Sequence, residues 1–451
     1  MKFKKCILVI LLLMSALFMD AERLSGSWNG RLHLGLQSLS LVFNVEGDSC
    51  TMDSPDQAAF GIPAKLELCT ADSLIVKVPE LDVSFEGELV GGRIEGMFHQ
   101  KGFSSVLVLK RGRPVYKRTQ DPQPPFPYET EEVTFVNPGD SAVLSGTLSY
   151  PVDYQEGKTP VVLMVTGSGR QNRDEEILYH RPFAVIAHHL ALNGIASLRY
   201  DDRGKDKSTG NFKNATTETF ADDAAAGLVF LRNIGKFGKV GLLGHSEGGT
   251  IAFILAGRGK TDFIVSLAGA ALRGDKILVG QNRPIMLSQG VPERMVDDYC
   301  RALEKMYEYK IAYGSSAIVY ADMAVAMAIS ETKADLPEDL RSMLVNLMKT
   351  ESPWFNYFIS YDPIDDIRRI KCPLMAVNGS LDTQVLSTPN LSVIRDNLRW
   401  KDCDVVREYE GLNHLFQHAV KGTLKEYLYI EETVSPEVLS DIAAFINAVT
   451  R

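Results

Sequence analysis

The chain has 451 residues, enough for two or three domains of roughly 150 residues each. Hydrophobic residues at 45% and charged residues at 23% are average for a soluble globular protein, which argues against disorder, a coiled coil, collagen or a polytopic membrane protein. The 48 Lys and Arg residues against 57 Asp and Glu residues give a net charge of −9 without a long basic run, so we expect no nucleic-acid partner.

The first residues have the pattern of an export signal. A short basic stretch at residues 2–5 precedes an almost unbroken apolar run from Cys6 to Phe18. That run is short for a membrane span and polar sequence follows at once, which predicts a signal peptide over residues 1–21. We therefore expect export to a bacterial periplasm or the extracellular space, with no membrane attachment after cleavage. An uncleaved anchor is the alternative.

The cysteines do not indicate a disulfide framework. Five remain after signal cleavage, an odd number scattered over hundreds of residues, and no Cys-x-x-Cys pair or Cys/His cluster suggests zinc. We expect no metal. Cys50 and Cys69 are the one pairing left open, since both fall near strand ends of one small region, but buried small hydrophobes are the preferred interpretation.

Residues 22–115 predict a small antiparallel β-domain. Stretches such as 39–45 and 74–78 alternate apolar and polar residues, and turn residues separate them. Strands with period two and no helical stretches indicate a barrel or a sandwich. Trp28 and Phe85 are candidates for a ligand-binding face, although single aromatics in small sheets are usually core residues.

The pattern changes after a Pro-rich linker predicted over residues 116–130. From residue 131 to 451 strands alternate with helices, which predicts a mainly parallel sheet with right-handed crossovers. The alternation stops between about 272 and 360, where a helical insertion follows a strand and is therefore predicted to be a lid over the ligand edge of the sheet. Methionines there suit either an adaptable apolar pocket or the insertion's own core. They are Met286, Met295, Met306, Met323, Met327, Met343 and Met348.

Residues 244–249 read Gly-His-Ser-Glu-Gly-Gly and join a predicted strand to a predicted helix. Gly-x-Ser-x-Gly in that position predicts a nucleophile elbow with Ser246 as the nucleophile. Such a turn is so tight that positions 244 and 248 tolerate almost no side chain, and it points the helix N-terminus at the reacting centre.

A serine hydroxyl needs an adjacent base to become nucleophilic. In the chain order Ser, acid, His, only His414 and His418 follow the serine far enough downstream. His414 comes directly after the last predicted strand and is predicted to be the base, whereas His418 is predicted to be a surface residue.

The acid is predicted to be Asp382, at the tip of a glycine-bearing turn after the preceding strand. It would accept the second imidazole N–H and stabilise the imidazolium. Asp362, Asp365 and Asp366 precede that strand and are interpreted as surface charges.

The oxyanion of an acyl-transfer reaction needs two preorganised donors. The elbow offers the backbone N–H of Glu247, and the loop at 166–170, after a predicted strand at 159–165, offers that of Ser168.

These features together resemble the α/β-hydrolase superfamily over residues 130–451, and within it a branch of exported bacterial esterases related to serine aminopeptidases. Residues 24–110 look like the β-domain that precedes the hydrolase in such proteins. Besides the elbow, the segments that carry the resemblance are 167–175 (Gly-Ser-Gly-Arg-Gln-Asn-Arg-Asp-Glu), 198–204 (Leu-Arg-Tyr-Asp-Asp-Arg-Gly), 352–355 (Ser-Pro-Trp-Phe) and 379–385 (Gly-Ser-Leu-Asp-Thr-Gln-Val).

The resemblance implies an α/β-hydrolase fold with Ser246, Asp382 and His414 as catalytic residues, and ester hydrolysis through an acyl-enzyme without metal or organic cofactor. Two departures from the family pattern stand out. Residues 166–167 are Thr-Gly where relatives often have His-Gly, and residues 203–208 are Arg-Gly-Lys-Asp-Lys-Ser where many have Arg-Gly-x-Gly-x-Ser.

Three functions follow from these patterns. The leading one is an exported serine esterase acting on small or medium acyl esters. The second is an aminopeptidase or amidase with the same triad, which would need a carboxylate for the substrate amine from Glu175, Glu176 or Glu247. The third is a glycan-binding protein in which the β-domain carries the function, although the intact triad argues against it. For the β-domain itself, contact with a glycan or cell-surface polymer and a role as a spacer or folding aid both stay open.

Overall fold

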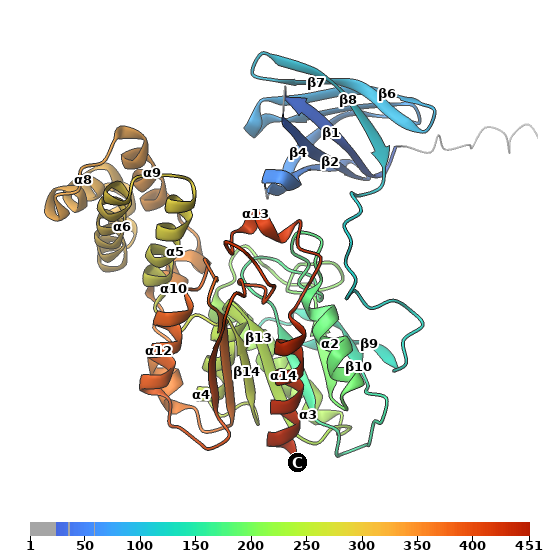
Figure 1. Ribbon diagram of the computed structural model, residues 1–451, viewed down its shortest axis with the longest axis vertical. Helices are drawn as coiled ribbons and strands as arrows, with labels where there is room; N and C mark the ends of the chain where they lie inside the picture. Colours follow the sequence, from blue (N-terminus) through green and yellow to red (C-terminus); the bar gives the residue numbers. More distant parts are fainter. Residues whose placement is uncertain (1–23, 35–36, 58) are drawn as a thin grey trace, which may run out of the picture. The chain divides into compact units, whose positions relative to one another are not determined.

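The computed structural model describes residues 24–34, 37–57 and 59–451 (Figure 1). The chain divides into two compact units, residues 1–117 and 118–451, which we describe separately. The predicted signal peptide lies outside the described residues. Within those described ranges, no helix is both long enough and apolar enough to cross a membrane.

The first unit is a closed antiparallel barrel whose eight strands follow one another in chain order. The barrel closes where Trp28 of β1 faces Arg111 of β8. Inward residues of the alternating strands form its core, with Trp28, Phe43 and Phe85 fully buried. The all-β prediction is thus confirmed as a barrel, and Trp28 and Phe85 are core residues. The strands are β1 (Gly26–Leu34), β2 (Gln37–Glu46), β3 (Ser49–Ser54), β4 (Ala59–Cys69), β5 (Ser73–Val78), β6 (Val83–Val90), β7 (Arg93–Gln100) and β8 (Phe103–Arg111).

Cys50 in β3 and Cys69 in β4 are free thiols in the structure. Burial, more than the nearby Cys69, raises the pKa of Cys50 to about 12. Because the thiolate is the reactive form, this raised pKa makes Cys50 a poor nucleophile, which fits the preferred interpretation as a buried small hydrophobe.

The second unit is built on an eight-stranded sheet in the order β9-β10-β12-β11-β13-β14-β15-β16. The strand β10 is antiparallel to both of its neighbours, and all the other pairs are parallel. The strands are β9 (Thr130–Val136), β10 (Val143–Ser149), β11 (Val161–Val165), β12 (Ala196–Tyr200), β13 (Val240–His245), β14 (Ile264–Leu267), β15 (Leu374–Gly379) and β16 (Val405–Tyr409).

Helices cover both faces of this sheet (Figure 1). One apolar cluster packs α3 (Thr217–Asn233), α4 (Glu247–Gly257), α11 (Ile364–Arg369) and α12 (Ser387–Asn397) against one face. A second cluster packs α2 (Pro182–Leu192) and α14 (Pro436–Thr450) against the other. The central strands β11 and β13 are buried along their whole length, which explains their continuous apolar sequence. The predicted α/β-hydrolase fold is thus confirmed. One further short helix, α13 (Leu424–Tyr427), precedes α14.

Six helices between β14 and β15 occupy the segment predicted to be a lid, and they have an apolar core of their own. Met286, Met306 and Met348 are buried in that core and Met295 packs against it, whereas Met323, Met327 and Met343 are exposed. Four of the seven methionines therefore contribute to the insertion's internal packing. The helices are α5 (Gly274–Ser288), α6 (Glu293–Tyr313), α7 (Ser315–Val319), α8 (Ala321–Thr332), α9 (Glu338–Lys349) and α10 (Pro353–Ser360).

Part of the segment predicted to be a linker is bound to the second unit. The Arg118 guanidinium donates to the backbone oxygens of Leu428 and Ile430, at 2.9 Å each. Gln120 donates to the backbone oxygen of Val434 at 2.7 Å. These bonds hold residues 118–120 beside the segment that leads into α14.

Candidate active site

The predicted elbow is a strained turn between β13 and α4. Ser246 has φ 54° and ψ −117°, a left-handed φ that is costly for a residue with a side chain. A Cβ atom on Gly244 would lie 2.0 Å from the backbone oxygen of Gly248, and one on Gly248 would lie 2.0 Å from that of Val165. Both positions therefore require glycine, and the Ser246 side chain stands at the carboxyl edge of the sheet.

The structure brings His414 and Asp382 together. His414 lies in the loop after β16, and its Nδ1 is 2.7 Å from Oδ2 of Asp382, which follows β15. The other carboxylate oxygen accepts the backbone N–H groups of Gln384 and Val385 at 2.8 and 2.9 Å. Both side chains are buried, so the carboxylate is held in a fixed orientation toward the imidazole.

Ser246 lies close to this pair without being bonded to it. The rings of His245 and His414 are 4.7 Å apart, which puts His414 beside the elbow. In the part of the chain that the structure describes, the Ser246 hydroxyl makes no hydrogen bond to His414. Such contacts are often long without substrate and tighten in the reacting complex.

The competing candidates occupy other environments. His418 is exposed and bonded to Glu432, as predicted for a surface residue. Asp362 and Asp365 are exposed. The interpretation of Asp366 as a surface charge is wrong, because it is buried and accepts a hydrogen bond from the Tyr361 hydroxyl at 2.5 Å.

The two backbone N–H groups predicted to bind an oxyanion, those of Ser168 and Glu247, are unoccupied among the described residues. Glu247 is the first residue of α4, and Ser168 follows Gly167, where a Cβ atom would come 3.1 Å from that of Ser246. The Gly167 N–H is occupied by Glu175 Oε1 at 2.7 Å.

The loop at residues 166–170, predicted to supply an oxyanion donor and called the oxyanion loop below, is supported by Asp202, which follows β12. Asp202 accepts hydrogen bonds from the Thr166 hydroxyl at 2.8 Å and from the backbone N–H of Gln171 at 2.7 Å. Burial raises the pKa of Asp202 to about 8, because water no longer solvates its charged form. Thr166 thus has a supporting function at a position where relatives often have histidine.

The second departure from the family pattern begins at a buried ion pair. The Arg203 guanidinium donates to both carboxylate oxygens of Asp223, at 2.8 and 2.6 Å, and also to Asp140. Arg203 and Asp223 are both buried, so this bidentate pair fixes the end of β12 against α3.

The carboxyl group of Glu247 is buried in the protein. Its Oε1 accepts hydrogen bonds from the Thr217 hydroxyl at 2.6 Å and from the Trp354 indole at 2.8 Å. Burial raises the pKa of Glu247, although these donors and the Ser168 hydroxyl favour its charged form. The residue after Ser246 therefore links α3 to α10, a helix of the insertion between β14 and β15.

The sequence interpretation missed a buried pair behind the elbow, formed by Glu175 and His245. His245 Nδ1 lies 2.9 Å from Glu175 Oε1, and its Nε2 lies 2.9 Å from the backbone oxygen of His414. Glu175 ends the Gly-rich segment of the family pattern, and His245 precedes the serine. Both residues lie in segments that carry the family resemblance, and this position is the sequence feature that could have indicated the pair. Because Glu175 and Glu247 are buried and hydrogen-bonded, neither is placed to bind a substrate amine, and Glu176 contacts Asn172.

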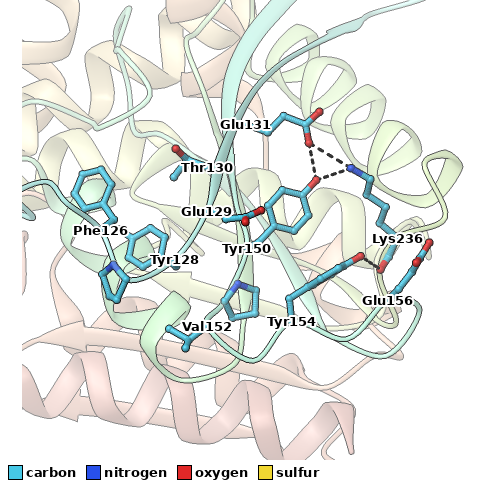
Figure 2. A pocket seen from close by; sticks show the side chains of 12 residues that line it. Phe126, Tyr128, Glu129, Thr130, Glu131, Tyr150, Val152, Tyr154, Glu156 and Lys236 are labelled. Atoms are coloured by element: carbon cyan, nitrogen blue, oxygen red, sulfur yellow. Dashed lines mark hydrogen bonds and ion pairs between the residues drawn. The ribbon is translucent and has the colours of Figure 1, made fainter.

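A cleft of about 770 Å³ lies elsewhere on this unit (Figure 2). Its wall includes Tyr150, whose hydroxyl donates to Glu131 and accepts from Lys236. Ser149 pairs with Ser197 near the start of β12, so the cleft is at the sheet edge opposite the one that carries Ser246. The cleft is therefore not part of the site around Ser246. In the described ranges, no group of three or more His, Cys, Asp or Glu side chains is arranged to hold a metal ion.

The fold and this site define a hydrolase of the esterase and peptidase class. The chain belongs to the X-Pro dipeptidyl-peptidase (S15) family, whose model matches residues 140–395, more than half of its length. The resemblance to α/β-hydrolases related to peptidases is thus confirmed.

Individual relatives are more distant. Esterase EstD of Thermotoga maritima is 23% identical over 360 residues, which cover 79% of this chain and 74% of EstD. Among solved structures, the Pyrococcus furiosus esterase Pf2001 has 18% identity, covers 71% of this chain and 93% of its own, and has a TM-score of 0.40. Est1E from Butyrivibrio proteoclasticus has 14% identity, covers 70% and 98%, and has a TM-score of 0.41. At these TM-scores, the fold assignment rests on the sheet order of this chain and on its family.

Proposed function

We propose that the protein is a serine carboxylesterase for small or medium acyl esters, with Ser246, His414 and Asp382 as its triad. The observation that carries this proposal is the 2.7 Å contact between His414 Nδ1 and Asp382 Oδ2 beside the strained elbow. Asp382 fixes the tautomer of His414, leaving Nε2 free to take a proton.

The reaction then has two halves. His414 Nε2 takes the Ser246 proton as Oγ attacks the ester carbonyl, and it returns that proton to the departing alcohol, leaving an acyl-serine. Water then gives a proton to His414 and attacks the acyl group, and the same proton restores the Ser246 hydroxyl as the acid leaves. The backbone N–H groups of Ser168 and Glu247 stabilise the oxyanion in both halves.

An ester is preferred over a peptide substrate because the candidate carboxylates are engaged. Glu175 holds Gly167 and His245, and Glu247 holds Thr217 and Trp354, so both would have to break buried bonds to bind an amine. The similarity to an esterase over 79% of the chain supports the same choice.

A second candidate is a peptidase that removes X-Pro dipeptides, which the family match over residues 140–395 favours. It would use the same triad, with a different group for the substrate amine.

The two candidates are separated by assaying the purified protein on p-nitrophenyl esters of graded chain length and on aminoacyl and X-Pro p-nitroanilides. We expect ester turnover that disappears in Ser246→Ala and little anilide turnover. Anilide turnover that exceeds ester turnover, and that also needs Ser246, would establish the peptidase.

We also propose that the protein is exported and that the barrel contacts a glycan or cell-surface polymer. The basic and then apolar pattern of residues 2–18 supports export, which predicts a mature N-terminus near residue 22 in the secreted or periplasmic fraction. Co-sedimentation with insoluble polysaccharide, with and without residues 22–117, tests the role of the barrel. Equal retention of both forms would leave it as a spacer or folding aid.

A further inference from the structure

Three chain segments meet behind Ser246 through two side chains. Glu175 Oε1 accepts the backbone N–H of Gly167 at 2.7 Å and lies 2.9 Å from His245 Nδ1. On the other side of the ring, His245 Nε2 lies 2.9 Å from the backbone oxygen of His414. The oxyanion loop, the elbow and the loop of the predicted base are therefore joined in one chain of hydrogen bonds.

The geometry determines how many protons this chain holds. A carbonyl oxygen only accepts, so His245 must carry a proton on Nε2 to bond His414. One further proton must lie between His245 Nδ1 and Glu175 Oε1, because a ring nitrogen and a carboxylate oxygen at 2.9 Å form a hydrogen bond only if one of them carries a proton. Burial lowers the pKa of His245, but Glu175, the His414 backbone oxygen and Asp382 together raise it, and the net direction is upward. The pair therefore holds two protons, and the raised pKa of His245 favours the form with an imidazolium and a carboxylate.

This arrangement is unfavourable for stability alone. Glu175 is 0% exposed, has a left-handed φ of 52°, and its Oε2 has no hydrogen-bond partner among the described residues. Burying two charges with an unsatisfied oxygen generally gives less stability than packing apolar side chains of the same volume. We therefore explain the presence of this buried pair by a role in holding the backbone in place, and not by a contribution to stability.

We propose that Glu175 and His245 act as one positioning unit that sets the oxyanion loop and the His414 loop at their working distance from Ser246. The proposal rests on the esterase mechanism and adds two residues that do not touch the substrate. The bond from its N–H to Glu175 fixes Gly167 directly before Ser168, whose own N–H has no acceptor among the described residues. A Cβ atom at position 167 would lie 3.1 Å from both Glu175 Oε1 and Ser246 Cβ, so this loop has little room to shift.

The test uses Glu175→Gln. The uncharged amide no longer balances an imidazolium, and a neutral His245 keeps its one N–H for the His414 oxygen. If the amide oxygen faces Nδ1, the link to His245 is lost, and if the amide NH2 group faces it, the Gly167 N–H loses its acceptor, so one link is lost in either orientation. Misplacement of this kind typically costs about 100-fold in rate, and we expect that loss in kcat with KM unchanged. His245→Gln should lose kcat similarly. If the two residues form one unit, the double variant should be no slower than the slower single variant.

Asp404→Asn is the matched control. The Asp404 side chain is also 0% exposed, accepts a backbone N–H from Leu374 at 2.9 Å and pairs with Lys401 at 3.0 Å. It lies at the start of β15 and β16, the sheet edge opposite the elbow. We expect it to lower the urea midpoint as Glu175→Gln does and to keep the wild-type kcat.

The proposal would be overturned if folded Glu175→Gln kept the wild-type kcat or changed only KM. It would also be overturned if the kcat losses of the two single variants multiplied in the double variant. Glu175→Asp keeps the charge and is the variant to assay if Glu175→Gln does not fold. Its shorter side chain cannot reach both partners, so kcat should again fall, and a wild-type kcat would again overturn the proposal. Failure of the esterase mechanism would show separately, as ester turnover that is absent from the wild type or kept by Ser246→Ala.

Discussion

The indole N–H of Trp354, in α10, donates a hydrogen bond of 2.8 Å to the carboxylate of Glu247, the residue directly after Ser246. The same oxygen, Oε1, accepts from Thr217 at the start of α3. One buried oxygen thus links the helical insertion between β14 and β15 to α4 and to α3. The insertion is therefore bonded to the first residue of α4, directly after Ser246.

Replacing Trp354 by Phe keeps the aromatic ring and removes this donor. We expect the unfolding free energy of the catalytic unit to fall by about 1–3 kcal/mol, because a buried carboxyl group loses a partner. Trp400→Phe is the control, since its indole donates to Arg395 on the exposed surface, and a surface change should stay within about 0.5 kcal/mol. Urea unfolding followed by circular dichroism compares them, and equal effects would contradict the anchoring role of Trp354.

Two helical glycines provide a test of the elbow geometry. In Gly248→Ala the new Cβ atom would lie 2.0 Å from the backbone oxygen of Val165, and backbone atoms cannot move away cheaply. We expect loss of ester hydrolysis together with destabilisation above about 3 kcal/mol, as for severe overpacking.

Gly280→Ala is the matched change in α5, where the Cβ atom meets only Leu386 Cδ1 at an ordinary 3.4 Å. The gain in helix propensity should leave stability unchanged or raise it by up to about 1 kcal/mol. Similar losses in both variants would mean that the elbow is no tighter than an ordinary helix.

The elbow was predictable from sequence because its determinants are local. Gly244, Ser246 and Gly248 lie within five positions at the junction of a strand and a helix, and the required glycines are visible in the letters. The order of Ser246, Asp382 and His414 along the chain likewise follows from strand alternation, since each residue lies in the segment that follows a parallel strand, β13, β15 or β16.

The features that sequence did not predict depend on distant contacts. Glu175 and His245 are 70 residues apart, and a carboxylate in a polar loop has the same letter whether it is buried or on the surface. Asp366 was misinterpreted for the same reason. The choice of barrel over sandwich depended on the pairing of Trp28 with Arg111, because period-two strands are common to both architectures.

The half-buried Asp202 should make stability depend on pH. Its pKa is raised to about 8 from an ordinary value of 3.8, so between these values the folded protein holds a proton that the unfolded chain releases. The contribution of Asp202 is therefore fully present below pH 3.8 and is lost as the pH rises toward 8.

Asp202→Asn cannot ionise, so we expect its stability relative to the wild type to increase between about pH 5 and pH 8, measured by urea unfolding. Asp140→Asn is the contrast, because the hydrogen bond from Arg203 lowers the pKa of this exposed carboxyl group. Its difference from the wild type should be the same at both pH values. A constant difference for Asp202→Asn as well would contradict the raised pKa.

The two downstream histidines should differ sharply in kinetics. We expect His414→Ala to lower kcat for an ester by at least about 10⁴-fold, as for loss of a triad base. His418→Ala should keep the wild-type rate, because this side chain is exposed and contacts only Glu432. A large loss in His418→Ala with activity kept in His414→Ala would reverse the assignment.

The central claim is that Ser246 is the nucleophile, and covalent labelling tests it most directly. A fluorophosphonate loses fluoride to an activated serine Oγ and leaves one phosphonyl group on it. Intact mass spectrometry and peptide mapping should find one adduct per chain, on Ser246, and none in Ser246→Ala. An equal adduct on Ser246→Ala, or ester turnover that persists in the fully labelled wild type, would contradict the account.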